Sequence, residues 1–405
     1  MKLKSLISTV LPCLMLLISP KLYAEEINDI YEQSLIQAVS DIQQLNHQQA
    51  LDDTRKLLEQ YPTSKVGQML YADLLLAKAG VLPSIGYGMQ QQSQRDDLTL
   101  EIKQRLSSQQ TPADQGLLPD SLLQLADNQP FYLLLDQSQS RLYVYRNEQG
   151  KPILEADYFL SIGLKGSGKE KRGDQKTPIG VYHVTQYIDD EALPDLYGKG
   201  AFPVNYPNSW DKRHRRTGDG IWLHGTPSYT YNRAPLSSNG CMVVSNPDFI
   251  NLKKYISPEM NTPVIVVKDI RWIDEGQWMV QQQQMNLLLS EWIKDWENKN
   301  HDDYISHYST TEFNARGRNY QQWSDYKRRV NAAKTFIDVD VSNLSIYRYP
   351  GEEELILMQF EQAYSSNNLS VESPKELYWK KQSNGWKIVS EDSRKVQLRK
   401  TLATN

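Results

Sequence analysis

The feature of this 405-residue sequence that most restricts its fold is a hydrophobic pattern that changes twice along the chain. Apolar residues recur at helical spacing from Glu25 to about Gly80, alternate with a period of two from Phe131 to Val267, and return to helical spacing from Gly276. A chain of this length is expected to form two or three domains. We therefore predict a multidomain α+β protein with a helical N-terminal region, a mainly β central domain and a C-terminal α+β domain.

Residues 1–24 have the features of a signal peptide. Lys2 and Lys4 precede a mostly apolar stretch that is too short for a comfortable transmembrane helix, and Leu22-Tyr23-Ala24 ends in a small residue that signal peptidases accept. No later segment is apolar enough to span a bilayer. We therefore expect an exported, periplasmic protein without a membrane span in its mature form, and we expect Cys13 to be removed with the leader.

The charge balance excludes several classes of function. The leader carries three lysines and no acid, so its removal changes the formal net charge from −4 to −7, with 42 basic and 49 acidic residues remaining. This balance argues against nucleic acid as a partner. The sequence has no Walker loop or dinucleotide fingerprint, and its cysteine and histidines lack the spacing of zinc ligands. We predict no cofactor and no metal.

The region from residue 25 to residue 82 is predicted to be a helical domain. Tyr61-Pro62 interrupts an apolar stripe, and Ser64 can cap the helix that follows. The pair resembles one degenerate tetratricopeptide hairpin, but the period does not repeat, so we favour a bundle that covers or pairs with another surface. A homodimer through these helices is one expectation. Residues 83–128 are predicted to be a linker with one helix near Asp96–Ser107.

Residues 129–270 are predicted to form the mainly β domain. Phe131–Leu135 and Arg141–Tyr145 flank a polar turn and predict a hairpin. Five more strand-like runs follow: Ile153–Ile162, Ile179–Thr185, Gly220–His224, Cys241–Val244 and Pro263–Val267. Residues 276–398 are predicted to form the C-terminal domain, with one long amphipathic helix, two shorter helices and then four β-rich stretches. These stretches are Ile337–Arg348, Leu355–Tyr364, Glu376–Gln382 and Gly385–Val389.

Cys241 is the single cysteine that remains after the leader. Exported proteins usually pair their thiols or avoid them, so an unpaired thiol there needs a reason, and nucleophilic catalysis is the strongest one. A small buried hydrophobic residue is the alternative. His224 precedes the cysteine by 17 residues, and an imidazole is the group that a thiol needs to take its proton.

Both residues stand next to glycine at predicted strand ends. Gly225 and Gly240 permit tight turns that expose backbone N–H groups. The amides of Asn239 to Cys241 could form an oxyanion hole, in which one donor is typically worth about 3 kcal/mol of barrier height. A thiol activated by the imidazole is expected to react well below the pH at which an ordinary cysteine reacts.

At these residues the sequence resembles the active-site signature of the L,D-transpeptidase catalytic domain, the YkuD-like family of cell-wall enzymes. That signature pairs an early histidine with a downstream Ser/Thr-His-Gly-Cys. Gly173–Tyr182 resembles the Thr-Pro-x-Gly-x-Tyr strand of the family, and Pro207–Asp211 followed by Arg216–Gly218 resembles the loop before its histidine strand. The resemblance implies Cys241 as nucleophile and His224 as base, with Gly240 and the Cys241 amide at the oxyanion and Ser238 in support.

Two positions depart from the family pattern. Asn239 stands where the family usually has a second histidine, and Val243 stands where many members have arginine. Loss of that arginine removes a group that could hold a substrate carboxylate, and Arg233, Arg215 or Arg216 could replace it. Two basic runs, Lys165–Lys176 and Lys212–Arg216, are either solvated loops or carboxylate-binding loops, and we favour binding for the second run.

The C-terminal domain resembles an NTF2-like domain, in which we predict no catalytic set. A YkuD-like domain followed by an NTF2-like domain is similar to the L,D-carboxypeptidases that trim peptidoglycan stems and set cell shape in some helical bacteria. The resemblance thus implies a peptidoglycan L,D-transpeptidase that acts on tetrapeptide stems through a Cys241 thioester, for 3–3 crosslinking or anchoring. Trimming of tetrapeptides to tripeptides is one alternative, and a non-catalytic cell-wall scaffold is another.

Overall fold

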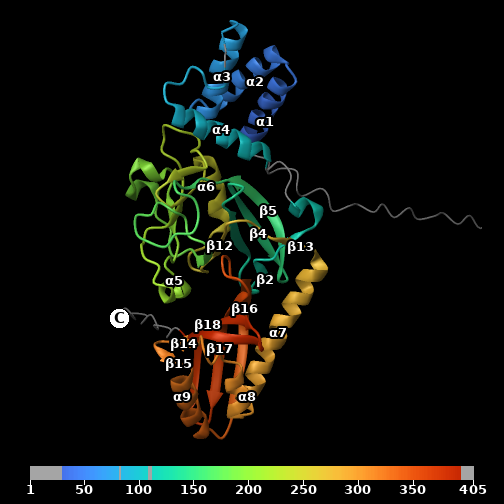
Figure 1. The fold of residues 1–405 in the computed structure, drawn as a ribbon, viewed down its shortest axis with the longest axis vertical. Helices are drawn as coiled ribbons and strands as arrows, with labels where there is room; N and C mark the ends of the chain where they lie inside the picture. Colours follow the sequence, from blue (N-terminus) through green and yellow to red (C-terminus); the bar gives the residue numbers. More distant parts are fainter. Residues whose placement is uncertain (1–29, 82–83, 108–111, 394–405) are drawn as a thin grey trace, which may run out of the picture.

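The computed structural model describes residues 30–81, 84–107 and 112–393. Figure 1 shows three successive parts along the long axis: a helical unit (30–81 and 84–107), a central unit rich in strands (130–267) and a C-terminal unit of helices and long strands (272–393). The predicted export signal lies outside the described residues. Within the described ranges, no helix is long and apolar enough to cross a bilayer.

The described part of the helical unit is a small bundle of α1 (Ile30–Gln43), α2 (His47–Gln60), α3 (Lys65–Lys78) and α4 (Gln92–Ser107). Helix α2 ends at the predicted break, and the side chain of Ser64 caps α3 by accepting a hydrogen bond from the backbone N–H of Gly67 at 3.0 Å. The apolar faces of the helices meet in a common core that includes Tyr31, Leu35, Leu57, Val66, Met69, Leu70 and Leu98. The bundle covers one end of the central unit (Figure 1).

The central unit is built on a five-stranded sheet in the order β5-β4-β3-β12-β7. Its strands are β3 (Phe131–Asp136), β4 (Arg141–Glu148), β5 (Lys151–Phe159), β7 (Gly180–His183) and β12 (Pro263–Val267). The predicted hairpin is present, with Leu135 of β3 opposite Leu142 of β4. Strand β12 pairs parallel with β3 and antiparallel with β7. The apolar runs of β3 and β12 are buried on both faces of the sheet.

A second, three-stranded sheet carries the residues of the candidate site. Its order is β11-β9-β8, with β8 (Ala201–Pro203), β9 (Trp222–His224) and β11 (Met242–Val243). Beside it, β6 (Ile162–Gly163) pairs with β10 (Leu236–Ser238). Helices α5 (Ser209–Arg213) and α6 (Asn246–Leu252) lie in the same unit. Short 3₁₀ helices are η1 (Pro112–Gln115), η2 (Asp190–Ala192), η3 (Asp195–Tyr197) and η4 (Lys253–Tyr255).

The C-terminal unit has the predicted order of helices followed by a meander. Its helices are α7 (Glu275–Glu297), α8 (His301–Ser306) and α9 (Tyr320–Ala332). Its long antiparallel strands are β16 (Ile337–Arg348), β17 (Leu355–Ser366), β18 (Leu369–Gln382) and β19 (Gly385–Ser393). Buried tryptophans of α7, including Trp292 and Trp296, pack against the sheet. A two-residue hairpin of β14 (Asn314–Ala315) and β15 (Arg318–Asn319) precedes α9. The predicted multidomain α+β class is confirmed.

The segment between the helical and central units differs from the predicted linker. Besides α4 it carries β1 (Leu118–Pro119) and β2 (Leu122–Gln124). Strand β1 pairs with β13 (Trp272–Ile273), and β2 is the edge strand of the C-terminal sheet beside β16. Leu123 is fully buried in the C-terminal core, and the indole N–H of Trp278 donates to the carbonyl of Leu122 at 2.7 Å. Two apolar residues per strand are too few for the sequence pattern to indicate these strands.

Candidate active site

His224 is the last residue of β9 and its side chain is buried. Its Nδ1 lies 2.7 Å from the carbonyl oxygen of Gly225, which can only accept, so Nδ1 carries the proton and Nε2 keeps its lone pair. The ring of Tyr197 packs edge-on against the imidazole, with the centroids 5.0 Å apart. Burial lowers the pKa of His224 to about 4, so the ring is a neutral base at neutral pH.

Cys241 directly precedes β11, the strand that runs parallel to β9. The register places Met242 beside Leu223 and Val243 beside His224, so the cysteine and the histidine lie on neighbouring strands. The side chain of Cys241 is half-buried, and its thiol donates to the carbonyl of Gly220 at 3.4 Å. The strand pairing thus brings next to one another two segments that carry the predicted catalytic residues, which are 17 positions apart in the sequence.

The resting charge state of the pair differs from the sequence expectation. Burial raises the pKa of the Cys241 thiol, against the opposing effects of the Trp222 backbone amide and the positive charges of Arg233 and Lys169. With the pKa of His224 lowered, the resting pair is a neutral thiol and a neutral imidazole. Low-pH reactivity of the free thiol is therefore not expected, because proton transfer has to accompany attack on the substrate.

The turn before Cys241 is fixed by hydrogen bonds to Ser238. Its Oγ donates to the carbonyl of Cys241 at 2.6 Å and accepts the backbone N–H of Gly240 at 3.0 Å. The Gly240 amide is therefore engaged and is not a free oxyanion donor, contrary to its predicted role. Gly240 has φ +121° and a Cβ there would lie 2.8 Å from the carbonyl of Lys176, so only glycine fits the turn. The oxyanion donors that remain from the prediction are the amides of Asn239 and Cys241.

Asn246, the first residue of α6, is a positioning residue that the sequence analysis missed. Its Oδ1 accepts the backbone N–H groups of Lys199 at 3.0 Å and Thr226 at 3.1 Å, and its Nδ2 donates to the carbonyl of Thr226 at 2.8 Å. A Cβ on Gly225 would lie 2.2 Å from that Oδ1. Because Gly225 has no side chain, the side chain of Asn246 can approach closely and hold the backbone that follows His224. The signal available in the sequence was the helix start at Ser245, which caps α6.

Of the three arginines predicted to hold a substrate carboxylate, Arg233 is held at the turn before the thiol, where its guanidinium donates to the carbonyl of Ser237. Its positive charge acts on the pKa values of both Cys241 and His224. From the first basic run, Lys169 is buried and also acts on the thiol, while its Nζ contacts Asp174 at 2.7 Å. Arg215 is exposed in a left-handed conformation with φ +58°.

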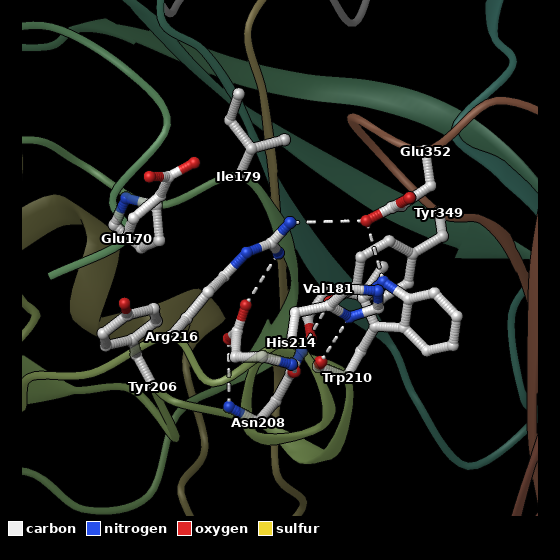
Figure 2. Close-up of polar contacts among 12 residues, drawn as sticks. Glu170, Ile179, Val181, Tyr206, Asn208, Trp210, His214, Arg216, Tyr349 and Glu352 are labelled. Atoms are coloured by element: carbon white, nitrogen blue, oxygen red, sulfur yellow. Dashed lines mark hydrogen bonds and ion pairs between the residues drawn. The ribbon is translucent and has the colours of Figure 1, made fainter. Parts of the chain in front are cut away.

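Figure 2 shows why Arg216 has a different role. One guanidinium nitrogen lies 3.0 Å from Asp211 and the other lies 3.3 Å from Glu352 of the C-terminal unit. Glu352 also accepts the indole N–H of Trp210 at 2.9 Å. Arg213, in the same basic run, donates to three backbone carbonyls of the C-terminal unit. The second run therefore joins two units, whereas sequence reasoning favoured it for substrate binding.

The C-terminal unit has a cavity of about 830 Å³ that shares no residue with this site. It is lined by charged and aromatic side chains, among them Lys375 and Glu391, which form a buried ion pair at 2.5 Å. Burial lowers the pKa of Lys327 in the same cavity to about 8. Among the residues that the structure describes, no cluster of His, Cys, Asp and Glu has the arrangement of a metal site.

A histidine at the end of one strand and a cysteine just before the parallel neighbouring strand, with a glycine turn before the thiol, are the residue types that a cysteine acyl-transfer site uses. Residues 130–266 match the family of L,D-transpeptidase catalytic domains (YkuD), and residues 284–392 match the Cds6 C-terminal NTF2-like domain. The chain therefore contains an L,D-transpeptidase catalytic domain followed by an NTF2-like domain, as the sequence resemblance implied. We refer to the central and C-terminal units by these names below.

Two solved structures share this architecture. Bd1075 from Bdellovibrio bacteriovorus is 29% identical, with a TM-score of 0.61, over 70% of this chain and 100% of that chain. Pgp2 from Campylobacter jejuni, described as a helical cell shape determining protein, is 26% identical, with a TM-score of 0.57, over 68% of this chain and 95% of that chain. No curated protein matches the chain.

Proposed function

We propose that this protein is an L,D-transpeptidase that acts on peptidoglycan tetrapeptide stems through a thioester on Cys241. The observation that supports the proposal is the parallel pairing of β9 and β11, because β9 ends at a neutral His224 with an unprotonated Nε2 and β11 directly follows the half-buried Cys241. The match to the L,D-transpeptidase catalytic domain supports peptidoglycan as the substrate class. An exported, periplasmic location follows from the substrate and from the predicted leader.

In the proposed reaction, Nε2 of His224 takes the thiol proton as Sγ of Cys241 attacks the carbonyl of the third stem residue. The amides of Asn239 and Cys241 stabilise the oxyanion. The bond to the terminal D-alanine breaks, the leaving amine takes the proton from His224, and a thioester remains. An amine of a second stem then attacks the thioester, the thiolate leaves and regains a proton, and a 3–3 crosslink forms.

Water in place of the amine is the second candidate function, and would make the protein an L,D-carboxypeptidase. One observation favours it: the two-domain architecture is shared with Pgp2, whose description concerns helical cell shape. Both candidates use the same thioester and differ only in the group that resolves it. The choice depends on whether the acceptor side of the site admits a stem amine or only water.

Incubation with purified disaccharide tetrapeptides, followed by mass spectrometry, tests the proposal. Crosslinked dimers are the expected product, tripeptide monomers indicate the carboxypeptidase, and the absence of both indicates a scaffold. Cys241→Ala is expected to abolish either product. Ser237→Ala, which changes a neighbouring side chain and leaves the thiol, is the matched control and is expected to retain activity. Product formation by Cys241→Ala would place the chemistry elsewhere.

The lowered pKa of His224 gives a pH prediction. The base form persists until the pH falls to about 4, so the acidic limb of the kcat/KM profile is expected there rather than near the ordinary histidine value of 6.5. His224→Ala is expected to reduce kcat by about 10²- to 10⁴-fold. An acidic limb centred near pH 6.5 in the wild-type protein would contradict a buried, neutral His224.

A further inference from the structure

The loop that connects β9 to β10, residues 225–235, contacts the helical unit. The backbone N–H of Tyr231 in this loop donates to the carbonyl of Thr63, in the turn between α2 and α3, at 3.2 Å. The ring of Tyr231 packs on Tyr31 with centroids 4.2 Å apart and on Tyr61 with centroids 4.8 Å apart. In Figure 1 this yellow-green part of the central unit reaches toward the helices. We call it the connecting loop.

The helical side of this contact is itself fixed. Tyr31 and Tyr61 pack edge to face at 5.1 Å, and the hydroxyl of Tyr31 lies 2.8 Å from Oγ of Ser64, the cap of α3. Tyr31 is almost fully buried, as is Tyr231. The three rings therefore form a closed aromatic cluster in which two members belong to the helical unit and one belongs to the connecting loop.

A buried ionic network attaches the helical unit to the five-stranded sheet of the central unit. Glu32 of α1 contacts Arg141 of β4 at 2.8 Å and Arg105 of α4 at 3.2 Å. Arg105 is buried, pairs with Glu101 at 3.1 Å, and lies over the ring of Phe159 at 3.8 Å. With partners on β4 and β5, the helical unit is held on the sheet independently of the connecting loop. It can therefore act as a fixed support for that loop.

The same loop carries Arg233, two residues after Tyr231. The carbonyl of Arg233 accepts the hydroxyl of Ser161 at 2.8 Å, and its guanidinium donates to the carbonyl of Ser237. Ser237 directly precedes Ser238, whose Oγ donates to the carbonyl of Cys241, so the guanidinium is held at the turn that carries the thiol. Its positive charge also acts on the thiol. One part of the connecting loop is thus held in the helical unit, and the next part presents a cation to Cys241.

We propose that the helical unit positions Arg233 at the active site, with Tyr31 and Tyr61 as positioning residues that hold Tyr231. Arg233 then receives the carboxylate of the terminal stem residue, a step that rests on the proposed function. Neither matched family region includes α1–α4, so this support is an addition outside the two matched domains. Arg233 then supplies, from another part of the chain, the positive charge that many family members have at the position of Val243.

The test measures the charge preference of the thiol in the full mature chain. Cys241 is its sole cysteine, so the alkylation rates with anionic iodoacetate and neutral iodoacetamide report on one site. Arg233→Gln is expected to lower the iodoacetate-to-iodoacetamide rate ratio about tenfold, because a cation in a cleft concentrates anions. Tyr61→Ala is expected to lower the ratio by a similar factor and to leave the iodoacetamide rate unchanged.

Matched variants separate positioning from loss of folding. Tyr61→Phe keeps the ring, and Tyr71→Ala removes a tyrosine of α3 that packs in a different cluster, so both are expected to keep the wild-type ratio. If Tyr61→Ala does not fold, Tyr61→Leu serves as the test, because it keeps apolar volume without the ring contact. A wild-type ratio in Tyr61→Ala or Tyr61→Leu overturns the proposal, and so does a wild-type ratio in Arg233→Gln.

The enzymatic readout distinguishes this inference from the proposed function. With tetrapeptide substrate, Tyr61→Ala is expected to raise KM about tenfold at unchanged kcat, since positioning of a carboxylate ligand affects binding of the ground and transition states alike. A fall in kcat at unchanged KM would overturn the inference. If the wild-type protein releases no D-alanine, the proposed function fails while the alkylation ratio still decides whether the helices position Arg233.

Discussion

Two outer segments of the L,D-transpeptidase domain, which we call its two walls, are held by different neighbours and by different physics. The connecting loop is held by the helical unit through three tyrosine rings and one backbone hydrogen bond. On the other wall, residues 208–216 are held by the NTF2-like domain through a network of side-chain hydrogen bonds and ion pairs (Figure 2). Each wall thus depends on a unit that lies outside the L,D-transpeptidase domain.

Because the supports differ, the two walls are expected to respond differently to a single substitution. Aromatic packing is not strongly directional, so a cluster of rings tolerates a conservative substitution. A buried polar network requires every partner, because removal of one partner leaves the others desolvated and unpaired. We therefore expect substitutions in the wall held by the NTF2-like domain to lower the free energy of unfolding. Substitutions that release the wall held by the helical unit are expected to change the charge preference of the site.

The largest effect on stability is expected for Asp211→Ala. Asp211 is fully buried and accepts hydrogen bonds from the Asn208 amide, the Tyr182 hydroxyl and Arg216. Its removal leaves these donors unpaired and is expected to lower the free energy of unfolding by about 3–5 kcal/mol. Urea unfolding measures the change. The control is Asp219→Ala, whose pair with Arg172 is exposed, with an expected change below about 0.5 kcal/mol. Equal losses in the two variants would contradict the network.

The networks that support the two walls are also expected to differ in the sign of their pH dependence. Arg141 and Arg105 hold the pKa of Glu32 below its ordinary 4.5 despite burial, so its stabilisation is present above that value and is lost as pH falls through the lower folded pKa. Burial raises the pKa of Asp211 above its ordinary 3.8, so its contribution is present below 3.8 and is lost as pH rises through the folded pKa.

Glu32→Gln and Asp211→Asn measure these opposite signs. The free-energy difference between wild type and Glu32→Gln is expected to reach about 2 kcal/mol at neutral pH and to shrink on acidification. The difference between wild type and Asp211→Asn is expected to grow on acidification. Urea unfolding at several values from about pH 3 to pH 7 covers both titrations. Parallel pH trends in the two variants would show that the walls do not differ electrostatically.

The smallest effect is expected for Tyr349→Phe. The hydroxyl of Tyr349 accepts one hydrogen bond from Nδ2 of Asn208 at 2.8 Å, and that nitrogen also donates to the carbonyl of Val181 at 2.9 Å. Because one partner remains, the expected loss of stability is about 1 kcal/mol. Tyr229→Phe, at an exposed side chain, serves as the control with no expected change. A loss for Tyr349→Phe as large as that for Asp211→Ala would show that the network acts as one unit.

The sequence predicted those parts of the fold that have a strong local pattern. The hairpin of β3 and β4, the long helix α7 and the long strands of the C-terminal sheet have a clear period, and the structure has them. Strands β1 and β2 were missed because they are two and three residues long, and their partners lie more than a hundred positions away. Pairing between distant segments leaves no periodic signal for so short a strand.

The residue types of the candidate site could be predicted from the sequence, but the hydrogen bonds that hold these residues in place could not. Cys241 and His224 were predicted from residue type and neighbouring glycines, and the structure has their segments on paired strands, with Val243 opposite His224. The backbone N–H of Gly240 donates to Ser238, and the side chain of Asn246 donates to the carbonyl of Thr226. These hydrogen bonds form only in the folded chain, so the spacing of residues in the sequence does not reveal them. The sequence likewise does not reveal that Arg216 is paired across domains, whereas the charge of Arg233 acts on the thiol.

The short strand β2 has a consequence for how this protein can be divided. The polypeptide contributes residues 122–124 to the NTF2-like sheet, then builds the whole catalytic domain, and returns to complete that sheet. Residues 276–398 expressed without residues 122–124 would leave the edge of β16 open and the indole of Trp278 without its acceptor. Recombination between relatives of this architecture therefore has to carry the two flanking pieces together, as a discontinuous module.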